Sequence, residues 1–192
     1  MYRNLPNLLS AIRLLLAPMV AWSICAGDFR RAAVLVFIAG ATDALDGYLA
    51  RSFSWQTPLG AYIDPLADKL LLVLSFLALG MAGAVPGWLV WLVLGRDLLI
   101  LLMVGIAFRF TDVRRFPPSL WGKGSTMIQV LTALAVIVDR AYVSLDYRNL
   151  EWILIALTAI ITLGSGIHYL WIGFSRFPAA RRARMLSRVV ER

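Results

Sequence analysis

The sequence predicts an all-α integral membrane bundle of six transmembrane helices with both termini on the cytoplasmic side. Three observations predict this fold. First, 60% of the 192 residues are hydrophobic and only 16% are charged, less charge than a soluble domain of this length carries. Second, the apolar residues fall in blocks of about 20, the length that crosses a bilayer as a helix. Third, the basic residues are divided unevenly between the two sets of connections.

Short segments rich in glycine, proline or charge separate the apolar blocks, and none is long enough to form a second domain. The first block contains Arg13 and Pro18 and lacks a small-residue cleavage site, so we interpret it as a span and not as a signal peptide. The six predicted spans are 6–26, 31–51, 59–82, 87–109, 120–138 and 151–174.

The distribution of lysine and arginine predicts the orientation. One side of the membrane receives twelve basic residues and the other only four, and the richer side includes both termini. By the positive-inside rule the richer side is cytoplasmic. We therefore divide the chain into a transmembrane domain, 1–175, and a basic cytoplasmic tail, 176–192. The tail carries six arginines but no aromatic platform, so we expect it to contact anionic lipid and not nucleic acid.

The stretch ATDALDGYLARSFSWQTPLGAYIDPLADK, 41–69, places four aspartates between apolar blocks. Asp43 and Asp46 are three residues apart near the end of the second predicted span. Asp64 and Asp68 are four apart at the start of the third. Each pair shares one helix face, and a short hairpin can bring the two pairs together at the cytoplasmic surface.

Four carboxylates in one small volume repel one another and lose hydration, and nearby Arg51 and Lys69 offset only part of this cost. Hard oxygen ligands without histidine or cysteine favour Mg²⁺, Mn²⁺ or Ca²⁺ over zinc. Mg²⁺ in such sites usually shares its coordination sphere with phosphate, and two metals can polarise a diphosphate. The pattern therefore predicts phosphoryl-type transfer at the membrane surface, with a lipid as one substrate and one carboxylate free to accept a proton.

Read as spacing, the segment is D-x2-D-G-x2-A-R-x8-G-x3-D-x3-D, and it resembles the signature of the CDP-alcohol phosphatidyltransferases. A chance match has odds on the order of 10⁻¹⁰ per starting point. The six-span layout also agrees with that family. The eight fixed positions are Asp43, Asp46, Gly47, Ala50, Arg51, Gly60, Asp64 and Asp68.

The resemblance implies a role for each of these residues. The four aspartates would bind two divalent metals, Mg²⁺ or Mn²⁺, and Asp68 would also be the general base. The CDP site would be lined by Gly47, Ala50, Arg51 and Gly60. The reaction would transfer a phosphatidyl group from CDP-diacylglycerol to an alcohol with release of CMP. The resemblance further implies a homodimer. The positive-inside rule predicts that the active site faces the cytoplasm from the cytoplasmic (inner) membrane.

The resemblance also implies a glycerol-type alcohol as the acceptor. The segments NLPNLLSAIRLLLAP and GAYIDPLADK resemble bacterial phosphatidylglycerophosphate synthases and cardiolipin synthases of the family. In GRDLLI the residue after Arg96 is Asp97, as in cardiolipin synthase-like members, which favours phosphatidylglycerol as acceptor over glycerol-3-phosphate.

Arg96 and Lys123 are the candidates for binding the acceptor phosphate. A charge inside an apolar helix is costly unless it is paired or functional, so a structural pair between Arg96 and Asp97 is the alternative. For Lys123 the alternative is an interfacial side chain that reaches the headgroups. By resemblance, Asn7 and Arg13 would steady the nucleotide or the aspartate helix.

Two other classes of protein compete with the enzyme. A divalent-cation transporter would also need intramembrane carboxylates, but its site would lie near the bilayer midplane. A structural membrane subunit could use the aspartates in ion pairs, although few basic residues are available nearby to balance them.

Overall fold

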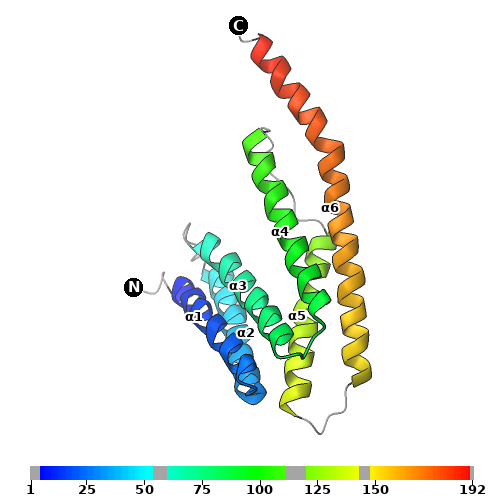
Figure 1. Cartoon of the computed structure of the whole chain (residues 1–192). Helices are drawn as coiled ribbons and strands as arrows, with labels where there is room; N and C mark the ends of the chain where they lie inside the picture. The colour runs from blue at the N-terminus through cyan, green and yellow to red at the C-terminus, as the bar shows by residue number, and fades with distance from the viewer. Residues whose placement is uncertain (1–4, 54–59, 111–119, 143–147, 191–192) are drawn as a thin grey trace.

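The chain was analysed as a computed structural model that describes residues 5–53, 60–110, 120–142 and 148–190. Over these ranges it is all-helical, which confirms the predicted class (Figure 1). The predicted starts and ends of the first five spans agree with the helices to within three residues. The helices are α1 Leu5–Cys25, α2 Phe29–Phe53, α3 Gly60–Met81, α4 Gly87–Phe110, α5 Leu120–Ala141 and α6 Arg148–Val190.

Glycines in the left-handed region end the first and third helices. Gly27 has φ 76° and follows α1, and Gly83 has φ 68° and follows α3. This conformation lets the next residues donate back to the last turn, as Asp28 N does to Ser23 O at 2.9 Å. Asp28 then caps α2, because its Oδ1 accepts from Arg31 N at 3.0 Å. The turns are thus tight, and consecutive helices run antiparallel.

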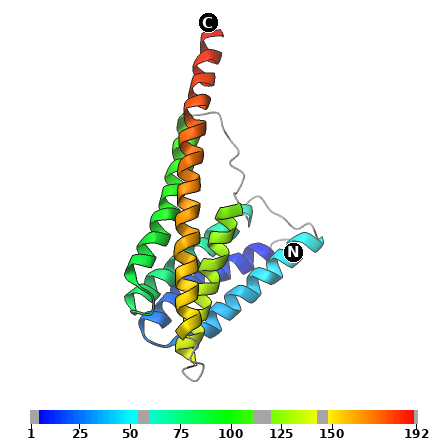
Figure 2. The same cartoon turned by 90° about the vertical axis from the view of Figure 1, so that its right-hand side faces the viewer.

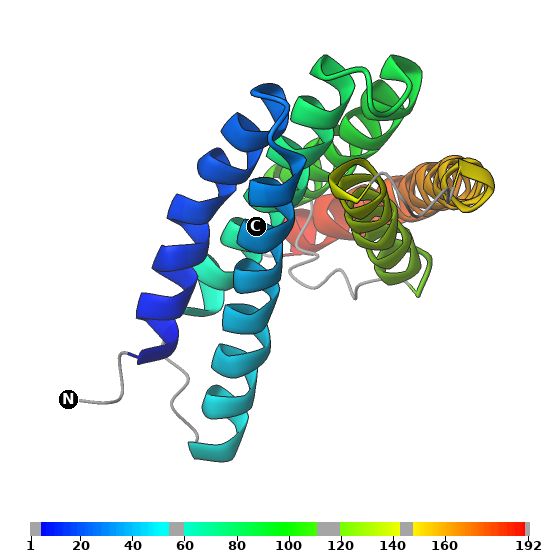
Figure 3. The ribbon, with the colours of Figure 1, turned by 90° about the horizontal axis from the view of Figure 1, so that it is seen from below.

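The helices form two groups that meet along α2, α3 and α5. The first group packs α1 against α2 and α3, and the second packs α6 against α4 and α5. Figure 3 shows the two groups side by side, and Figure 2 shows α1 and α2 inclined to α6. The start of α1, the end of α2, the start of α3 and the end of α6 point in the same direction along the bundle (Figure 1). The acidic residues of the second half of α2 and the first half of α3 therefore lie toward that side.

Apolar side chains fill the space between the two groups. Phe76 and Leu79 of α3, Leu89 and Val93 of α4, and Val136 of α5 are all completely buried in one cluster. Many large apolar side chains on the outer faces are exposed, among them Trp22, Phe37 and Trp91. An exposed apolar surface of this extent suits a lipid environment.

A seam of buried polar side chains joins α5 to α6. Thr132 and Thr158 hydroxyls are 2.7 Å apart, and Gln129 Nε2 donates to Ser125 Oγ and Thr162 Oγ1 at 3.2 Å each. In membrane helices each such hydrogen bond contributes roughly 0.6 kcal/mol. The seam fixes the register of α5 against α6 by pairing successive turns of the two helices.

Three helices in the described part are long and apolar enough to cross a membrane: Leu8–Cys25, Trp121–Ala141 and Asn149–Trp171. These segments overlap the first, fifth and sixth predicted spans. The helices α2, α3 and α4 have 25, 22 and 24 residues, which is also sufficient length. Their crossing of the membrane, and with it the six-span topology, stays a prediction.

The last helix is much longer than the predicted sixth span. It has 43 residues and so extends about 65 Å, whereas a bilayer core is about 30 Å thick. The helix continues through most of the segment that we predicted as a separate basic tail (Figure 2). The division into a transmembrane domain and a tail at residue 175 stays a prediction.

A pair of glycine substitutions tests the close approach of α3 and α4. A Cβ at Gly80 would lie 2.7 Å from Val90 Cγ2, whereas a Cβ at Gly95 meets no atom within 4 Å. Overpacking costs about 1–3 kcal/mol, more than the roughly 1 kcal/mol that alanine gains over glycine in a helix. We expect Gly80→Ala to lower the unfolding temperature in detergent and Gly95→Ala to leave it unchanged or raise it. Equal unfolding temperatures for the two variants would contradict this packing.

Candidate active site

Arg13 is the centre of the polar cluster, and the sequence of α1 explains why it is buried. Positions three or four residues apart form the inner face of this helix. Besides Arg13 they include Ser10, Ala17, Val20 and Ile24, and all five residues are buried. The Arg13 side chain is only 1% exposed. A guanidinium in this position requires anionic partners, because an unpaired buried charge is very costly.

Three aspartates from two other helices supply those partners. Arg13 Nη1 lies 2.9 Å from Asp43 Oδ1 and also contacts Asp68 Oδ1, while Nη2 pairs with Asp46 Oδ2. Asp46 is buried, whereas the side chains of Asp43 and Asp68 are 54% and 52% exposed. The carboxylates of α2 and α3 thus meet at one side chain of α1, which packs against both helices.

The fourth aspartate contacts a different residue of α1. Ser10 Oγ donates a hydrogen bond to Asp64 Oδ1. Sequence reasoning did not select Ser10, although its place three residues before Arg13 is a local signal for a shared face. All four predicted metal ligands therefore face the inner side of α1.

The charges of the cluster do not balance. Arg13 contributes one positive charge and its three partners contribute three negative charges, so this group has a net charge of −2. The carboxylate oxygens are hard donors that converge on one cation, which fits Mg²⁺ or Mn²⁺. Within the described residues, no three His, Cys, Asp or Glu side chains are already arranged to hold a metal ion. The donor set suits a divalent cation, but here the guanidinium supplies the positive charge.

A cavity of about 640 Å³ opens beside the cluster. Its polar end carries Arg13, Asp43, Asp68 and Lys69. Apolar side chains of α2, α3 and α5 form the remaining wall, and they include Val36, Phe37, Leu71, Leu72, Val130, Leu134 and Ile137. A charged end joined to an apolar wall matches an amphipathic ligand, with a polar headgroup beside the carboxylates and a hydrocarbon chain between α2 and α5.

Arg96 and Lys123 do not line this cavity. Arg96 is buried and pairs with Asp97 Oδ1 at 2.8 Å, which is the structural alternative stated above. Lys123 is exposed in the first turn of α5. Their role in acceptor binding stays a prediction.

The remaining predicted site residues are outside the part of the chain whose side chains the structure describes. These residues are Asn7, Gly47, Ala50, Arg51 and Gly60. Their backbone belongs to α1, α2 and α3, and their roles in nucleotide binding stay predictions.

Fold and site define a helical membrane protein with a carboxylate-rich, lipid-sized cavity. The sequence model of the family described as CDP-alcohol phosphatidyltransferase matches residues 3–164. The chain belongs to the CDP-alcohol phosphatidyltransferase family.

Curated relatives carry two different names. The chain is 32% identical over 173 residues to CDP-diacylglycerol–glycerol-3-phosphate 3-phosphatidyltransferase of Aquifex aeolicus, covering 89% of this chain and 96% of that protein. It is 30% identical over 184 residues to the CMP-forming cardiolipin synthase of Rattus norvegicus, covering 86% of this chain and 61% of that protein. A probable phosphatidylglycerophosphate synthase of Mycobacterium tuberculosis is 30% identical over 174 residues, with 86% and 79% covered. The chain thus spans less than two thirds of the rat cardiolipin synthase.

Substitution of Arg13 tests the electrostatic centre of the site. In Arg13→Met the carboxylates, including buried Asp46, lose their cation. Without added divalent cations, we expect the free energy of unfolding to fall by roughly 3 kcal/mol. This value is at the lower end of the range for breaking a buried ion pair, because two of the carboxylate partners are half exposed. Thermal unfolding in detergent measures the loss, and Arg13→Lys should fall between wild type and Arg13→Met. An Arg13→Met protein as stable as wild type would show that the pairing contributes little.

Proposed function

We propose that the protein transfers the phosphatidyl group of CDP-diacylglycerol to a glycerol-type alcohol and releases CMP. The observation that carries the proposal is the convergence of Asp43, Asp46 and Asp68 on Arg13. Of these, Asp43 and Asp68 line the polar end of a cavity with apolar walls. The polar end suits the pyrophosphate of the donor, and the apolar wall suits its acyl chains. Family membership supports the same reaction and disfavours a cation transporter.

The chemistry follows from the residues at the polar end. The acceptor hydroxyl oxygen attacks the phosphorus that bears the diacylglycerol, the P–O bond to CMP breaks, and CMP leaves with the electron pair. Asp68 lines the cavity, is half exposed, and would accept the hydroxyl proton. When bound by the four aspartates, two divalent cations would neutralise the pyrophosphate and stabilise the leaving oxygen. Asp43, Asp46 and Asp64 would hold those cations together with Asp68, which would also act as the base.

The acceptor is phosphatidylglycerol or glycerol-3-phosphate. Asp97 after Arg96 favours phosphatidylglycerol, as in cardiolipin synthase-like members. The Aquifex aeolicus relative favours glycerol-3-phosphate, because this chain matches nearly the full length of that protein. Both acceptors carry a phosphate and a free hydroxyl, so either suits the same chemistry.

We also propose that the site faces the cytoplasm from the cytoplasmic membrane, in a homodimer. The end of α2 and the start of α3 point in the same direction along the bundle as the start of α1 and the end of α6 (Figure 1). The excess of basic residues on the side of the termini supports a cytoplasmic location for that end.

CMP release tests the proposed function. Purified protein with CDP-diacylglycerol and Mg²⁺ or Mn²⁺ should release CMP only when an acceptor alcohol is present. Analysis of the lipid products formed with glycerol-3-phosphate and with phosphatidylglycerol then identifies the acceptor. Loss of the base in Asp68→Asn should lower turnover by at least about 100-fold. Asp28→Asn is the matched control, since Asp28 caps α2 away from the site and asparagine caps equally well.

Two outcomes contradict the proposal. Absence of CMP release with every acceptor and metal would exclude the reaction. Full turnover of Asp68→Asn would exclude Asp68 as the base.

Filling the apolar part of the cavity tests the lipid site. Gly40 lines the cavity, and a Cβ there meets no atom within 4 Å. We expect Gly40→Phe to lower turnover of long-chain CDP-diacylglycerol by about tenfold or more, because the phenyl ring displaces the acyl chain from the cavity wall. Turnover of a short-chain donor should fall less. Gly95→Phe, outside the cavity, is the control. Equal effects on long-chain and short-chain donors would contradict an acyl site at Gly40.

A further inference from the structure

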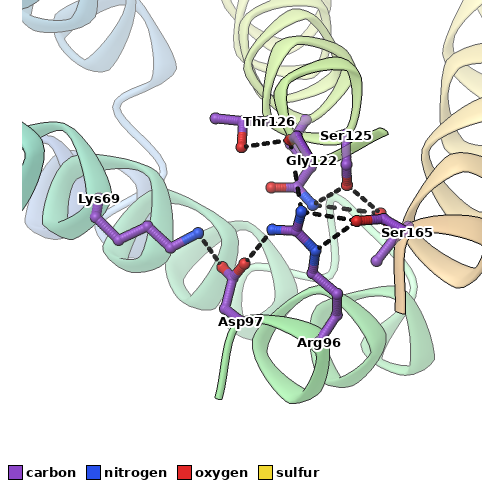
Figure 4. A network of polar contacts seen from close by, with 9 residues as sticks. Lys69, Arg96, Asp97, Gly122, Ser125, Thr126 and Ser165 are labelled. Atoms are coloured by element: carbon purple, nitrogen blue, oxygen red, sulfur yellow. Dashed lines mark hydrogen bonds and ion pairs between the residues drawn. The ribbon is translucent and has the colours of Figure 1, made fainter. Parts of the chain in front are cut away.

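A second polar cluster lies beside the cavity and centres on Asp97 of α4 (Figure 4). The Asp97 side chain is 7% exposed and has a cation on each side. Arg96 Nη1 donates to Oδ1 at 2.8 Å, and Lys69 Nζ of α3 forms an ion pair with Oδ2. Oδ2 is buried and accepts no hydrogen bond in the described part of the chain, so the ammonium is its electrostatic partner.

Arg96 is fixed by contacts with two further helices. Its Nη2 and Nε donate to Ser165 Oγ of α6 at 2.8 and 3.2 Å, and Nη2 also lies 3.4 Å from Gly122 O of α5. The guanidinium carbon lies 5.9 Å from the centre of the Tyr169 ring. A guanidinium with this many partners cannot turn freely, so it holds the carboxylate of Asp97 in one orientation. Figure 4 shows the series of contacts from Ser165 through Arg96 and Asp97 to Lys69.

Lys69 is the member of this cluster that reaches the cavity. Its side chain is 35% exposed and lines the cavity together with Asp68. Consecutive residues on a helix point about 100° apart, so Asp68 faces Arg13 while Lys69 faces Asp97. An ammonium has three N–H donors, and one ion pair with Asp97 does not use them all.

The net charges of the two clusters are opposite. Lys69 and Arg96 contribute two positive charges against the single negative charge of Asp97, a net charge of +1. The cluster around Arg13 has a net charge of −2. Of the three residues in the second cluster, Lys69 lines the cavity, so an anion there meets the positive charge of its ammonium beside the acidic residues.

We propose that Lys69 binds a phosphate group of a substrate in this cavity and that Asp97 and Arg96 are positioning residues for Lys69. The proposal rests on the proposed function, because it names a group that binds a substrate of that reaction. The phosphate belongs either to the CDP-linked donor or to the acceptor. The ion pair with Asp97 keeps the long lysine side chain extended toward α4, so that less rotamer freedom is lost when the anion binds.

Steady-state kinetics of Lys69 variants test the proposal. KM is measured for CDP-diacylglycerol at saturating acceptor, and for each acceptor at saturating donor. Loss of a charge-assisted hydrogen bond predicts that Lys69→Met and Lys69→Gln raise KM for one phosphate-bearing substrate about 10- to 100-fold. We expect kcat to change much less, and Lys69→Arg to recover most of the affinity. The substrate whose KM rises identifies the source of the phosphate.

Asp97→Asn tests the positioning role. It removes the charge that holds Lys69 and keeps the shape, so KM for the same substrate should rise by a smaller factor than in Lys69→Met. Arg140→Met is the matched control, because Arg140 forms an ion pair with Glu151 between α5 and α6, away from the cavity. Its KM values should equal those of wild type.

Failure of this inference is distinguishable from failure of the proposed function. If wild type releases no CMP, the proposed function is wrong. If wild type is active and the Lys69 variants keep the KM values of both substrates, the phosphate site is excluded. The same conclusion holds if these variants have a lower kcat and a lower unfolding temperature but unchanged KM values, because Lys69 is then structural. Lys69→Gln retains a hydrogen-bond donor for Asp97. Its KM values can therefore be compared with those of wild type even if Lys69→Met does not fold.

Discussion

The structure depends on one electrostatic arrangement, the buried guanidinium of Arg13 between carboxylates from α2 and α3. Neither side of this arrangement is stable alone within an apolar bundle: the arginine would be an unpaired buried cation, and the aspartates would repel one another. Together they fix the order of the first three helices, since α1 must present Arg13 and Ser10 to both acidic pairs. The pairing leaves excess negative charge, and a two-metal reaction needs such a surplus.

The cavity gives this surplus a chemical use. Its lining changes from charged to apolar side chains, which suits the proposed lipid substrate with a diphosphate headgroup. The remaining helices support that wall. The polar seam joins α5 to α6, and Arg96 ties α4 to both of these helices. Lys69 of α3 connects this second group to the cavity, because it lines the cavity and forms an ion pair with Asp97 of α4.

Much of the fold follows from the sequence, because the apolar blocks and their glycine and proline boundaries are local signals. The convergence of the acidic pairs also follows, since a helix period and a short hairpin leave few alternatives for Asp43, Asp46, Asp64 and Asp68. The partners of these residues are tertiary information. Nothing local indicates that Asp97 pairs with Lys69 as well as Arg96, or that Ser10 reaches Asp64. The length of α6 was also missed, because its last turns lack the apolar pattern that marks a span.

The central claim is that the acidic hairpin binds divalent cations that in turn bind a CDP-linked pyrophosphate. Titration of Mn²⁺ into the purified protein, followed by electron paramagnetic resonance with and without CDP, tests it most directly. If metal and nucleotide share one site, each must strengthen the binding of the other by the same factor. The account predicts tighter Mn²⁺ binding with CDP, and loss of this effect when Asp43 and Asp68 are both changed to asparagine. Mn²⁺ binding that is indifferent to CDP and to these two carboxylates would contradict it.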